Sequence, residues 1–359
     1  MMMMSSAVSR SALPLLLLIA LAASAPLRGQ MLPQAPSGPL PHPTHLPPSA
    51  APAPPAPPAG SGRGSARIPT LVVNSNLVNV VFSVEHNHAF VPGLTRNDFR
   101  VLENGQPQRI EFFSASQDLP LTLGWLLDTS PSQLNLLPEE QALSGQFFHQ
   151  VVQPKDLAFV LGFDSGLHLL QDLTNSTRFL TQAVNRAHIG GGSAASVLNP
   201  GPFPQSGGGT LLWDAIVAAC RGPLAQQVGR KAIVVITDGQ DQGSRHTPAQ
   251  AARALLDSNT ILFAVIAADP GAYGGFYRGA GQLSHVAQLS GGQTYYARRG
   301  QMVRDFNAIA AALRSQYSLG YQPSVPLSQG GYRRIQVELI GAAKHSGKVR
   351  ARVGYYAHP

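Results

Sequence analysis

The sequence predicts an α/β protein in which a doubly wound, mostly parallel sheet is flanked by a small β-sandwich-like module built from both ends of the domain. Apolar runs of strand length occupy residues 121–127, 231–236 and 261–267 without polar alternation, which is typical of strands buried on both faces. Segments with helical spacing follow these runs, as expected for parallel strands joined by crossovers. Alternating segments rich in β-branched residues lie before and after this region, and each group is too small to form a stable sheet alone.

The N-terminal region predicts export. Residues 1–29 are expected to be a signal peptide, because Arg10 precedes an apolar run at 12–23. This run is shorter than the roughly 20 apolar residues that a membrane-spanning helix needs. Residues 30–67 are rich in Pro, Ala and Gly and predict a disordered linker, able to tether the domain to the cell envelope. We therefore expect a periplasmic or secreted protein, with an uncleaved N-terminal membrane anchor as the alternative.

Two β segments flank the central region. The N-terminal one covers residues 68–118, where a strand over 97–103 is followed by Asn104-Gly105, the strongest two-residue hairpin signal. The chain is expected to return over 109–114. The C-terminal segment covers residues 317–359, with strands expected at 317–321, 332–340 and 348–356. We expect the two segments to pair with each other.

Residues 119–316 are expected to form the α/β domain. Its strands are predicted at 121–127, 156–163, 168–172, 231–236, 261–267 and 294–297. Its helices are predicted at 133–151, 175–187, 211–220, 247–256, 283–289 and 302–315, with Thr174 as the N-cap of the second. The long loop over 190–209 is rich in Gly, Ser and Pro, and a loop of this length is either functional or disordered.

Composition argues against nucleic-acid binding and against sites built on pairs of cysteines. The net charge is +8, but charged residues make up only 12% of the chain and form no basic stripe interleaved with aromatic residues, so no nucleic-acid partner is expected. Cys220 is the only cysteine, which excludes an intrachain disulfide and any metal site built on cysteine pairs.

Oxygen-bearing side chains follow the predicted strands at three places. Asp128, Ser130 and Ser132 alternate directly after the first strand, Thr210 stands at the entrance to a helix, and Asp238 follows the strand at 231–236. Open α/β sheets place their ligands at the carboxyl ends of their strands, so we expect these side chains to meet. Mg²⁺ takes about six oxygen ligands, and the sequence therefore predicts a site for Mg²⁺, or for Mn²⁺ or Ca²⁺.

These three segments carry a resemblance to a known family. DTSPS, GGTLLWDAI and VVITDG, in this order, resemble the metal-ion-dependent adhesion site of von Willebrand factor type A domains, a Rossmann-like fold. The resemblance implies that Ser130, Ser132 and Thr210 bind the metal directly, and that Asp128 and Asp238 are ligands or accept hydrogen bonds behind it. Pro131 departs from the family, where many members have Gly, and it stiffens the loop.

The flanking segments carry a second resemblance. TRNDFRVLENGQPQRIEFF before the metal loop, and YSLGYQP with YRRIQVEL after the last helix, look like the VWFA-related family described mainly from acidobacteria. This resemblance covers roughly residues 70–357 and implies an exported protein with a type A domain between β flanks.

Three hypotheses for function follow. The first is a non-enzymatic, metal-dependent protein-binding module of the adhesion type, whose cation engages an Asp or Glu carboxylate of a partner, because neutral hydroxyl ligands leave the cation electron-poor. The second is a structural or assembly component of the cell envelope with a static metal. The third is a metal-dependent hydrolase, but His246 and His285 have no nucleophile nearby in the sequence. Asp241 is either a support for the metal site or, as we expect, a solvated loop acid, and Asp214 either supports the site or caps its helix.

Overall fold

The computed structural model describes residues 77–86, 89–115, 119–190, 209–267, 279–297, 300 and 302–358. Contacts divide the chain into residues 1–70 and 71–359, and all described residues belong to the second unit. The predicted signal peptide (1–29), the predicted linker (30–67) and most of the loop at 190–209 lie outside the described residues. Within the described ranges, no helix combines the length and apolarity needed to cross a membrane.

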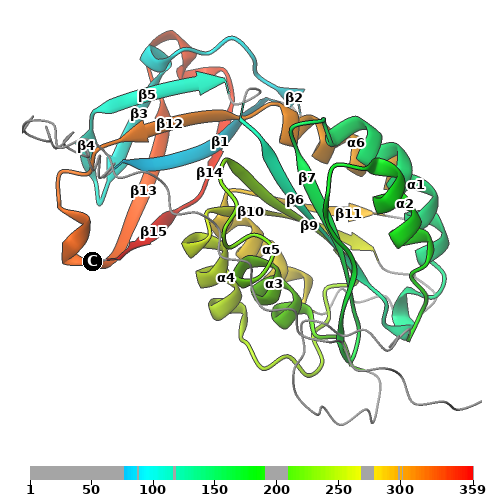
Figure 1. Cartoon of the computed structure of the whole chain (residues 1–359). Helices are drawn as coiled ribbons and strands as arrows, with labels where there is room; N and C mark the ends of the chain where they lie inside the picture. Colours follow the sequence, from blue (N-terminus) through cyan, green and yellow to red (C-terminus); the bar gives the residue numbers. More distant parts are fainter. Residues whose placement is uncertain are drawn as a thin grey trace, which may run out of the picture. The chain divides into compact units, whose positions relative to one another are not determined.

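A six-stranded sheet forms the centre of the α/β region, in the order β11-β10-β9-β6-β7-β8 (Figure 1). Its strands are β6 (Leu121–Asp128), β7 (Leu157–Phe163), β8 (Leu167–Thr174), β9 (Arg230–Thr237), β10 (Thr260–Ala267) and β11 (Thr294–Ala297). Neighbouring strands from β11 to β7 are parallel, whereas β8 is antiparallel to β7. The sheet is therefore mixed, and β8 departs from the expected parallel arrangement. The connection from β7 to β8 is a tight turn, which is too short for a parallel crossover.

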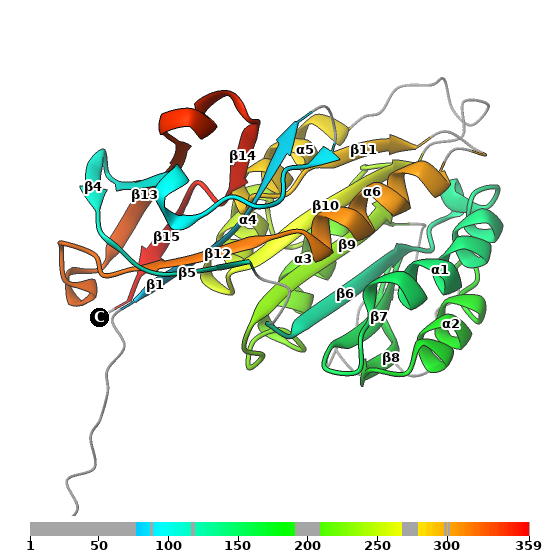
Figure 2. The ribbon, with the colours of Figure 1, turned by 90° about the horizontal axis from the view of Figure 1, so that it is seen from above.

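Helices cover both faces of this sheet (Figure 2). They are α1 (Leu137–Val151), α2 (Thr177–Asn185), α3 (Leu212–Arg221), α4 (Pro248–Asp257), α5 (Ala280–Ser290) and α6 (Met302–Arg314). Trp125 packs in one core with α1, α2 and α6, and Leu126 packs in the other with α3, α4 and α5. Successive strand residues point to opposite faces, so a strand buried on both faces needs an almost wholly apolar run such as that of β6.

Three helix boundaries show how local chemistry sets the elements. Thr247 caps α4 as expected, since its side chain accepts a hydrogen bond from the backbone N–H of Gln250. The cap of α2 is Ser176 and not the predicted Thr174, because β8 continues through Thr174. The helix predicted from residue 133 begins at Leu137, because Pro131 starts a separate 3-10 turn, Pro131–Gln133.

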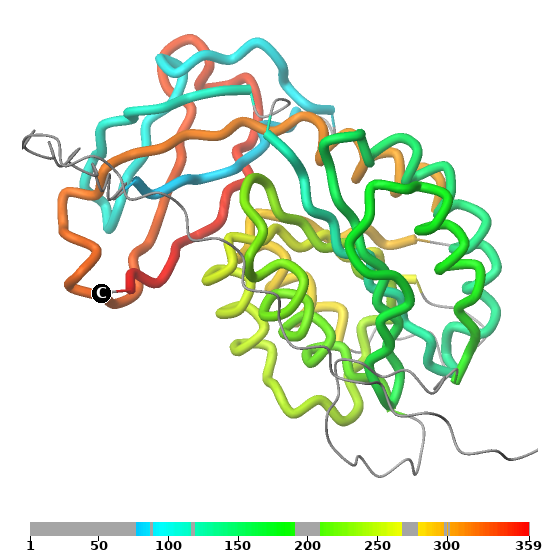
Figure 3. Tube along the Cα trace, viewed as in Figure 1, coloured from blue at the N-terminus to red at the C-terminus, as the bar shows by residue number. Residues whose placement is uncertain are grey.

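The two flanking β segments pair with each other. One sheet contains β14, β1, β12 and β5, with β2 on β1; the other contains β15, β13, β3 and β4. These strands are β1 (Val78–His86), β2 (Ala89–Phe90), β3 (Phe99–Glu103), β4 (Gln106–Gln108), β5 (Ile110–Ala115), β12 (Tyr317–Tyr321), β13 (Gly331–Leu339), β14 (Lys348–Ala351) and β15 (Gly354–Ala357). The C-terminal β12 lies between the N-terminal β1 and β5, and both sheets contribute to one hydrophobic core (Figure 3).

Two predicted strands of this module were wrong in extent. The Asn104-Gly105 hairpin is confirmed, with φ values of 50° and 84° that suit a type I′ turn. However, the chain returns first as β4 and then changes sheet as β5, where the prediction had one strand over 109–114. The single strand predicted over 348–356 is likewise two strands, β14 and β15, in different sheets.

Candidate metal centre

The loop after β6 is organised by Asp128, which is fully buried. Its Oδ1 accepts a hydrogen bond of 2.9 Å from the backbone N–H of Ser130, and its Oδ2 accepts one of 2.6 Å from the hydroxyl of Thr237 at the end of β9. A carboxylate that bonds to the N–H two residues later forms an Asx turn, which fixes the start of the loop. Asp128 therefore holds the first serine of the motif and ties two neighbouring strands together.

The two serines of the motif face each other. Ser130 Oγ and Ser132 Oγ lie 3.0 Å apart. Oxygens at neighbouring corners of a magnesium octahedron with 2.0–2.1 Å bonds lie about 2.9 Å apart. The pair is thus spaced as two ligands of one Mg²⁺ would be, although the same distance also suits a hydrogen bond between the hydroxyls.

Asp238 approaches Asp128 from the neighbouring strand. It follows β9, is 7% exposed, and its Oδ1 accepts a hydrogen bond of 2.9 Å from the backbone N–H of Gln240. Burial, with a smaller contribution from the negative charge of Asp238, raises the pKa of Asp128 to about 6, although hydrogen bonds from Ser130 and Thr237 oppose the shift. The two carboxylates therefore repel each other where the strands end, and a cation would relieve this repulsion.

Thr210 is joined to the loop that follows Asp238. The residue is 6% exposed, and its backbone N–H and C=O pair with those of Gln242 at 3.1 and 2.9 Å. This two-bond bridge connects the entrance of α3 to the loop after β9. Main-chain hydrogen bonds thus fix the segment that carries Thr210 relative to the loop that follows Asp238.

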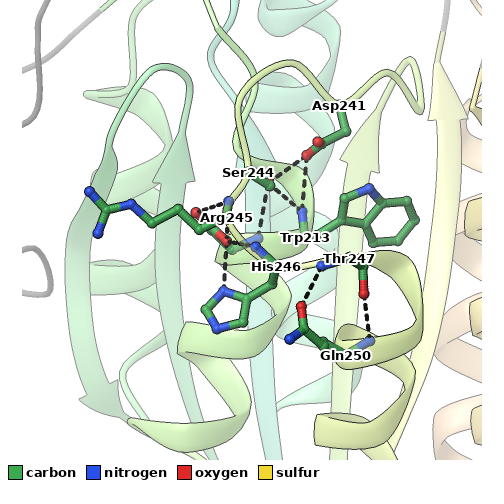
Figure 4. Close-up of polar contacts among 8 residues, drawn as sticks. Trp213, Asp241, Ser244, Arg245, His246, Thr247 and Gln250 are labelled. Atoms are coloured by element: carbon green, nitrogen blue, oxygen red, sulfur yellow. Dashed lines mark hydrogen bonds and ion pairs between the residues drawn. The ribbon is translucent and has the colours of Figure 1, made fainter.

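A set of polar contacts fastens the same loop to the start of α3 (Figure 4). Ser244 Oγ donates a hydrogen bond of 2.5 Å to Asp241 Oδ1 and accepts one of 3.1 Å from the backbone N–H of Trp213. Asp241 Oδ1 also lies 3.3 Å from that N–H. Asp241, considered from sequence as a support for the metal site or as a solvated acid, instead caps α3 together with Ser244.

Asp214 and His246 complete this connection. Asp214 Oδ1 accepts hydrogen bonds of 2.9 Å from the backbone N–H of His246 and 2.7 Å from its Nδ1. The contacts resemble those of a Ser-His-Asp hydrolase only in composition. The hydroxyl proton of Ser244 is given to Asp241, and His246 bonds to Asp214 and not to Ser244, so no general base lies behind a nucleophile here.

The acidic groups alone do not make a metal site. Across the described ranges, no three His, Cys, Asp or Glu side chains converge as metal ligands would. A cation at this edge of the sheet would therefore depend on the hydroxyls of Ser130, Ser132 and Thr210. This is the ligand set that the sequence motifs imply.

Sequence analysis missed two buried acids beside the motif. Asp164 follows β7, and its Oδ2 accepts a hydrogen bond of 3.2 Å from Thr129 Oγ1. Glu140 lies on α1 with 0% exposure. Burial raises the pKa of Glu140 well above its ordinary value, and the charges of Asp128 and Glu139 add to the shift. Helical spacing could have identified Glu140, because it falls on the face of α1 that also buries Leu137.

Comparisons with known proteins give similarity in fold. No family model and no curated protein matches the chain. The conserved hypothetical protein BatB from Bacteroides thetaiotaomicron is 17% identical over 54% of this chain and 100% of that one, with a TM-score of 0.39. The vWF domain of the type V pili tip protein Mfa5 from Porphyromonas gingivalis is 11% identical over 54% of this chain and 94% of that one, also at 0.39. A von Willebrand factor type A structure from Catenulispora acidiphila is 12% identical over 78% of this chain and 72% of that one, at 0.41.

These three structures are at most 17% identical to this chain, with TM-scores of at most 0.41. Similarity at this level says nothing about the ligand or the activity of this chain. The likeness of the β flanks to the family described mainly from acidobacteria stays a prediction. The chain is thus similar to these structures in fold alone, and the resemblance of its DTSPS, GGT and TDG loops to the type A adhesion site stays a prediction.

Proposed function

We propose that the protein is an exported, non-enzymatic binding module that engages a protein partner through a divalent cation. Ser130, Ser132 and Thr210 would hold Mg²⁺, or Mn²⁺ or Ca²⁺ in its place, with Asp128 and Asp238 behind them. The partner would supply an Asp or Glu carboxylate to an open position on the cation. Export rests on the N-terminal sequence alone.

The observation that carries this proposal is the pair of serine hydroxyls at 3.0 Å beside a buried carboxylate. Both oxygens of Asp128 already accept hydrogen bonds, so its charge would act on the cation from behind the hydroxyls. A cation held by neutral hydroxyls keeps most of its positive charge. Such a cation favours an anionic ligand, and a carboxylate is the anion that protein partners present.

A non-enzymatic role is preferred because Ser244, His246 and Asp214 are not arranged as a nucleophile with its base. Ser244 and His246 both serve the connection between α3 and the loop after β9. The hydrolase hypothesis would need turnover of a phosphoester that depends on added Mg²⁺ or Mn²⁺. The second alternative, an envelope component with a static metal, predicts cation binding without any carboxylate partner.

Cation binding can be tested by thermal unfolding of the full chain in Mg²⁺, in Mn²⁺ and in EDTA. A ligand that binds only the folded state stabilises it by mass action, by about 2.7 kcal/mol at 100 times its Kd. Ser132→Ala should lose the cation-dependent rise in Tm. Ser346→Ala is a matched control, because Ser346 is equally half-buried but lies in the β module.

Partner recognition needs a separate measurement. An array of acidic peptides, each paired with a version in which Gln and Asn replace Glu and Asp, should bind the wild-type chain in Mg²⁺ and lose binding in EDTA. Retention of the acidic peptides in EDTA, or equal binding of the amide versions, would contradict the carboxylate mechanism. A cation-dependent Tm with no peptide binding would favour the static metal.

A further inference from the structure

The segment that follows the DTSPS loop contains buried oxygen atoms that no hydrogen-bond donor of the described part of the chain reaches. Gln133 and Glu140 are both 0% exposed. Among the residues that the structure describes, Gln133 Oε1 and both carboxylate oxygens of Glu140 have no hydrogen-bond partner. Buried polar atoms are almost always paired, so three unpaired acceptors in one short segment require an explanation.

Backbone hydrogen bonds connect these residues directly to the metal loop. The N–H of Gln133 donates to the C=O of Ser130 at 3.0 Å, the N–H of Leu136 to that of Gln133 at 2.9 Å, and the N–H of Glu140 to that of Leu136 at 3.1 Å. Three successive turns therefore lead from the first serine of the motif to Glu140. The negative charge of Asp128 raises the pKa of Glu140, which agrees with a position close to the loop.

A buried carboxylate without a partner is costly. Removing such a charge from water is strongly unfavourable unless it is paired, hydrogen-bonded or bound to a metal. The ion pairs found among the described residues include none with Glu140, Asp128 or Asp238. A methionine or leucine of similar volume would fill the same space in the core without this cost. The position therefore fits an incoming positive charge better than it fits packing.

We propose that Glu140 is a positioning residue of the cation site, one that supplies negative charge and hydrogen-bond acceptors to a hydrated divalent cation bound at the DTSPS loop. This inference rests on the proposed cation site. Direct coordination by Glu140 is not part of it, because no three acidic, His or Cys side chains converge within the described ranges. Mg²⁺ usually keeps several of its waters, and their hydrogens are the donors that the oxygens of Glu140 and Gln133 lack.

The alternative is that Glu140 is a protonated, neutral packing residue. The two roles predict different results for Glu140→Gln, which keeps the shape of the side chain and removes its charge. If Glu140 is a neutral packing residue, Glu140→Gln should leave the cation affinity unchanged. If Glu140 is a positioning residue, Glu140→Gln should weaken cation binding, by about 10- to 100-fold if the effect matches that of residues that support metal ligands in other proteins.

The test is titration of the full chain with Mn²⁺ by calorimetry, together with thermal unfolding in EDTA. Glu139→Gln is the matched control, since it makes the same change of charge one residue earlier on α1, where the side chain is only half-buried and accepts a hydrogen bond from the N–H of Gly300. We expect Glu140→Gln to weaken Mn²⁺ binding strongly and to raise the Tm in EDTA, because it removes the cost of burying an ionisable group without the cation. Glu139→Gln should change neither value to a comparable extent.

The outcomes separate this inference from the proposed function. Mn²⁺ binding by the wild type and equally by Glu140→Gln would overturn the role of Glu140 and leave the cation site intact. Absence of Mn²⁺ binding by the wild type would overturn both. Glu140→Met is a second variant of similar volume, and loss of Mn²⁺ affinity with an unchanged or higher Tm in EDTA would support the role even if the glutamine variant fails to fold.

Discussion

Thr237 donates a 2.6 Å hydrogen bond from its hydroxyl to Oδ2 of Asp128, so the last residue of β9 holds the last residue of β6. The N–H of Gly239 in turn donates to Thr237 Oγ1 at 3.1 Å. One threonine thus links the two strand ends that carry the acidic positions of the motif. The contact joins residues 109 positions apart, and it sets where Asp128 and Asp238 meet.

Thr237→Val should destabilise the cation-free protein by about 1–3 kcal/mol, because a buried carboxylate oxygen loses its donor. It should also raise the pKa of Asp128, since the hydrogen bond from Thr237 lowers it. Urea unfolding in EDTA measures the first effect. Thr122→Val makes the same change near the start of β6 and serves as the control. Equal loss of stability in the two variants would mean that the hydrogen bond to Asp128 contributes no more to stability than the burial of any threonine hydroxyl.

The stability of the cation-free protein should fall as the pH rises from about 4 to about 6. Burial raises the pKa of Asp128 from its ordinary value of 3.8 to about 6, so in this window the folded state binds a proton that the unfolded state has lost. The full shift corresponds to about 3 kcal/mol, as an order of magnitude. The pKa of Glu140 is also raised by burial, so this residue contributes to the same fall in stability with rising pH.

Urea unfolding in EDTA at several pH values measures this slope. Asp128→Asn should flatten it, because the amide does not titrate, and should remain folded, because it can still accept from Ser130 and contact Thr237. A wild-type protein that becomes steadily more stable across this window would contradict the prediction. Saturating Mg²⁺ should reverse the trend, because the cation favours the ionised carboxylate.

Much of the fold follows from local patterns, and the exceptions are set by distant contacts. The apolar run of β6 and the capping box of Thr247 are visible in the sequence, and both elements form where expected. The division of the last segment into β14 and β15 is not visible, because each half pairs with a different strand, β14 with Val84 of β1 and β15 with Tyr332 of β13. Alternation alone cannot choose between two sheets.

The candidate site shows the same limit. The motif residues could be named from sequence, because each directly follows a strand or precedes a helix. Asp241 could not be assigned, because its role depends on Ser244 and the N–H of Trp213, 28 positions away. Glu140 was overlooked because a glutamate is ordinarily solvated, although its position on α1 belongs to the buried face.

The β module contains a buried polar network that should matter for stability and not for cation binding. Glu103 is 3% exposed, and its Oε2 accepts hydrogen bonds from the hydroxyls of Tyr321 at 2.7 Å and Tyr355 at 2.9 Å, while Arg333 lies 3.2 Å from Oε1. Tyr321→Phe removes one bond to a charged acceptor and should cost about 1.5–3 kcal/mol.

Urea unfolding and Mn²⁺ titration of Tyr321→Phe together check this prediction. The control is Tyr332→Phe, since Tyr332 is 45% exposed and its hydroxyl makes only a long bond of 3.4 Å to Val353. We expect loss of stability in the first variant alone and unchanged Mn²⁺ affinity in both. A large loss of affinity in Tyr321→Phe would show that the β module is coupled to the loops of the sheet.

The start of α5 packs so closely on the loop after β9 that one methyl group should disturb it. Gly279 has a φ of +88°, and a Cβ there would lie 2.0 Å from the carbonyl oxygen of Gly239, the residue after Asp238. Gly279→Ala should therefore lower the Tm and weaken Mn²⁺ binding together, because the loop must move to make room.

Gly281→Ala is the control, because a Cβ at this position inside the helix would meet nothing within 4 Å. It should stabilise the protein by up to about 1 kcal/mol, through helix propensity, with unchanged Mn²⁺ affinity. Equal behaviour of the two variants would mean that the loop after β9 adapts freely and that its close contact with α5 does not position Asp238.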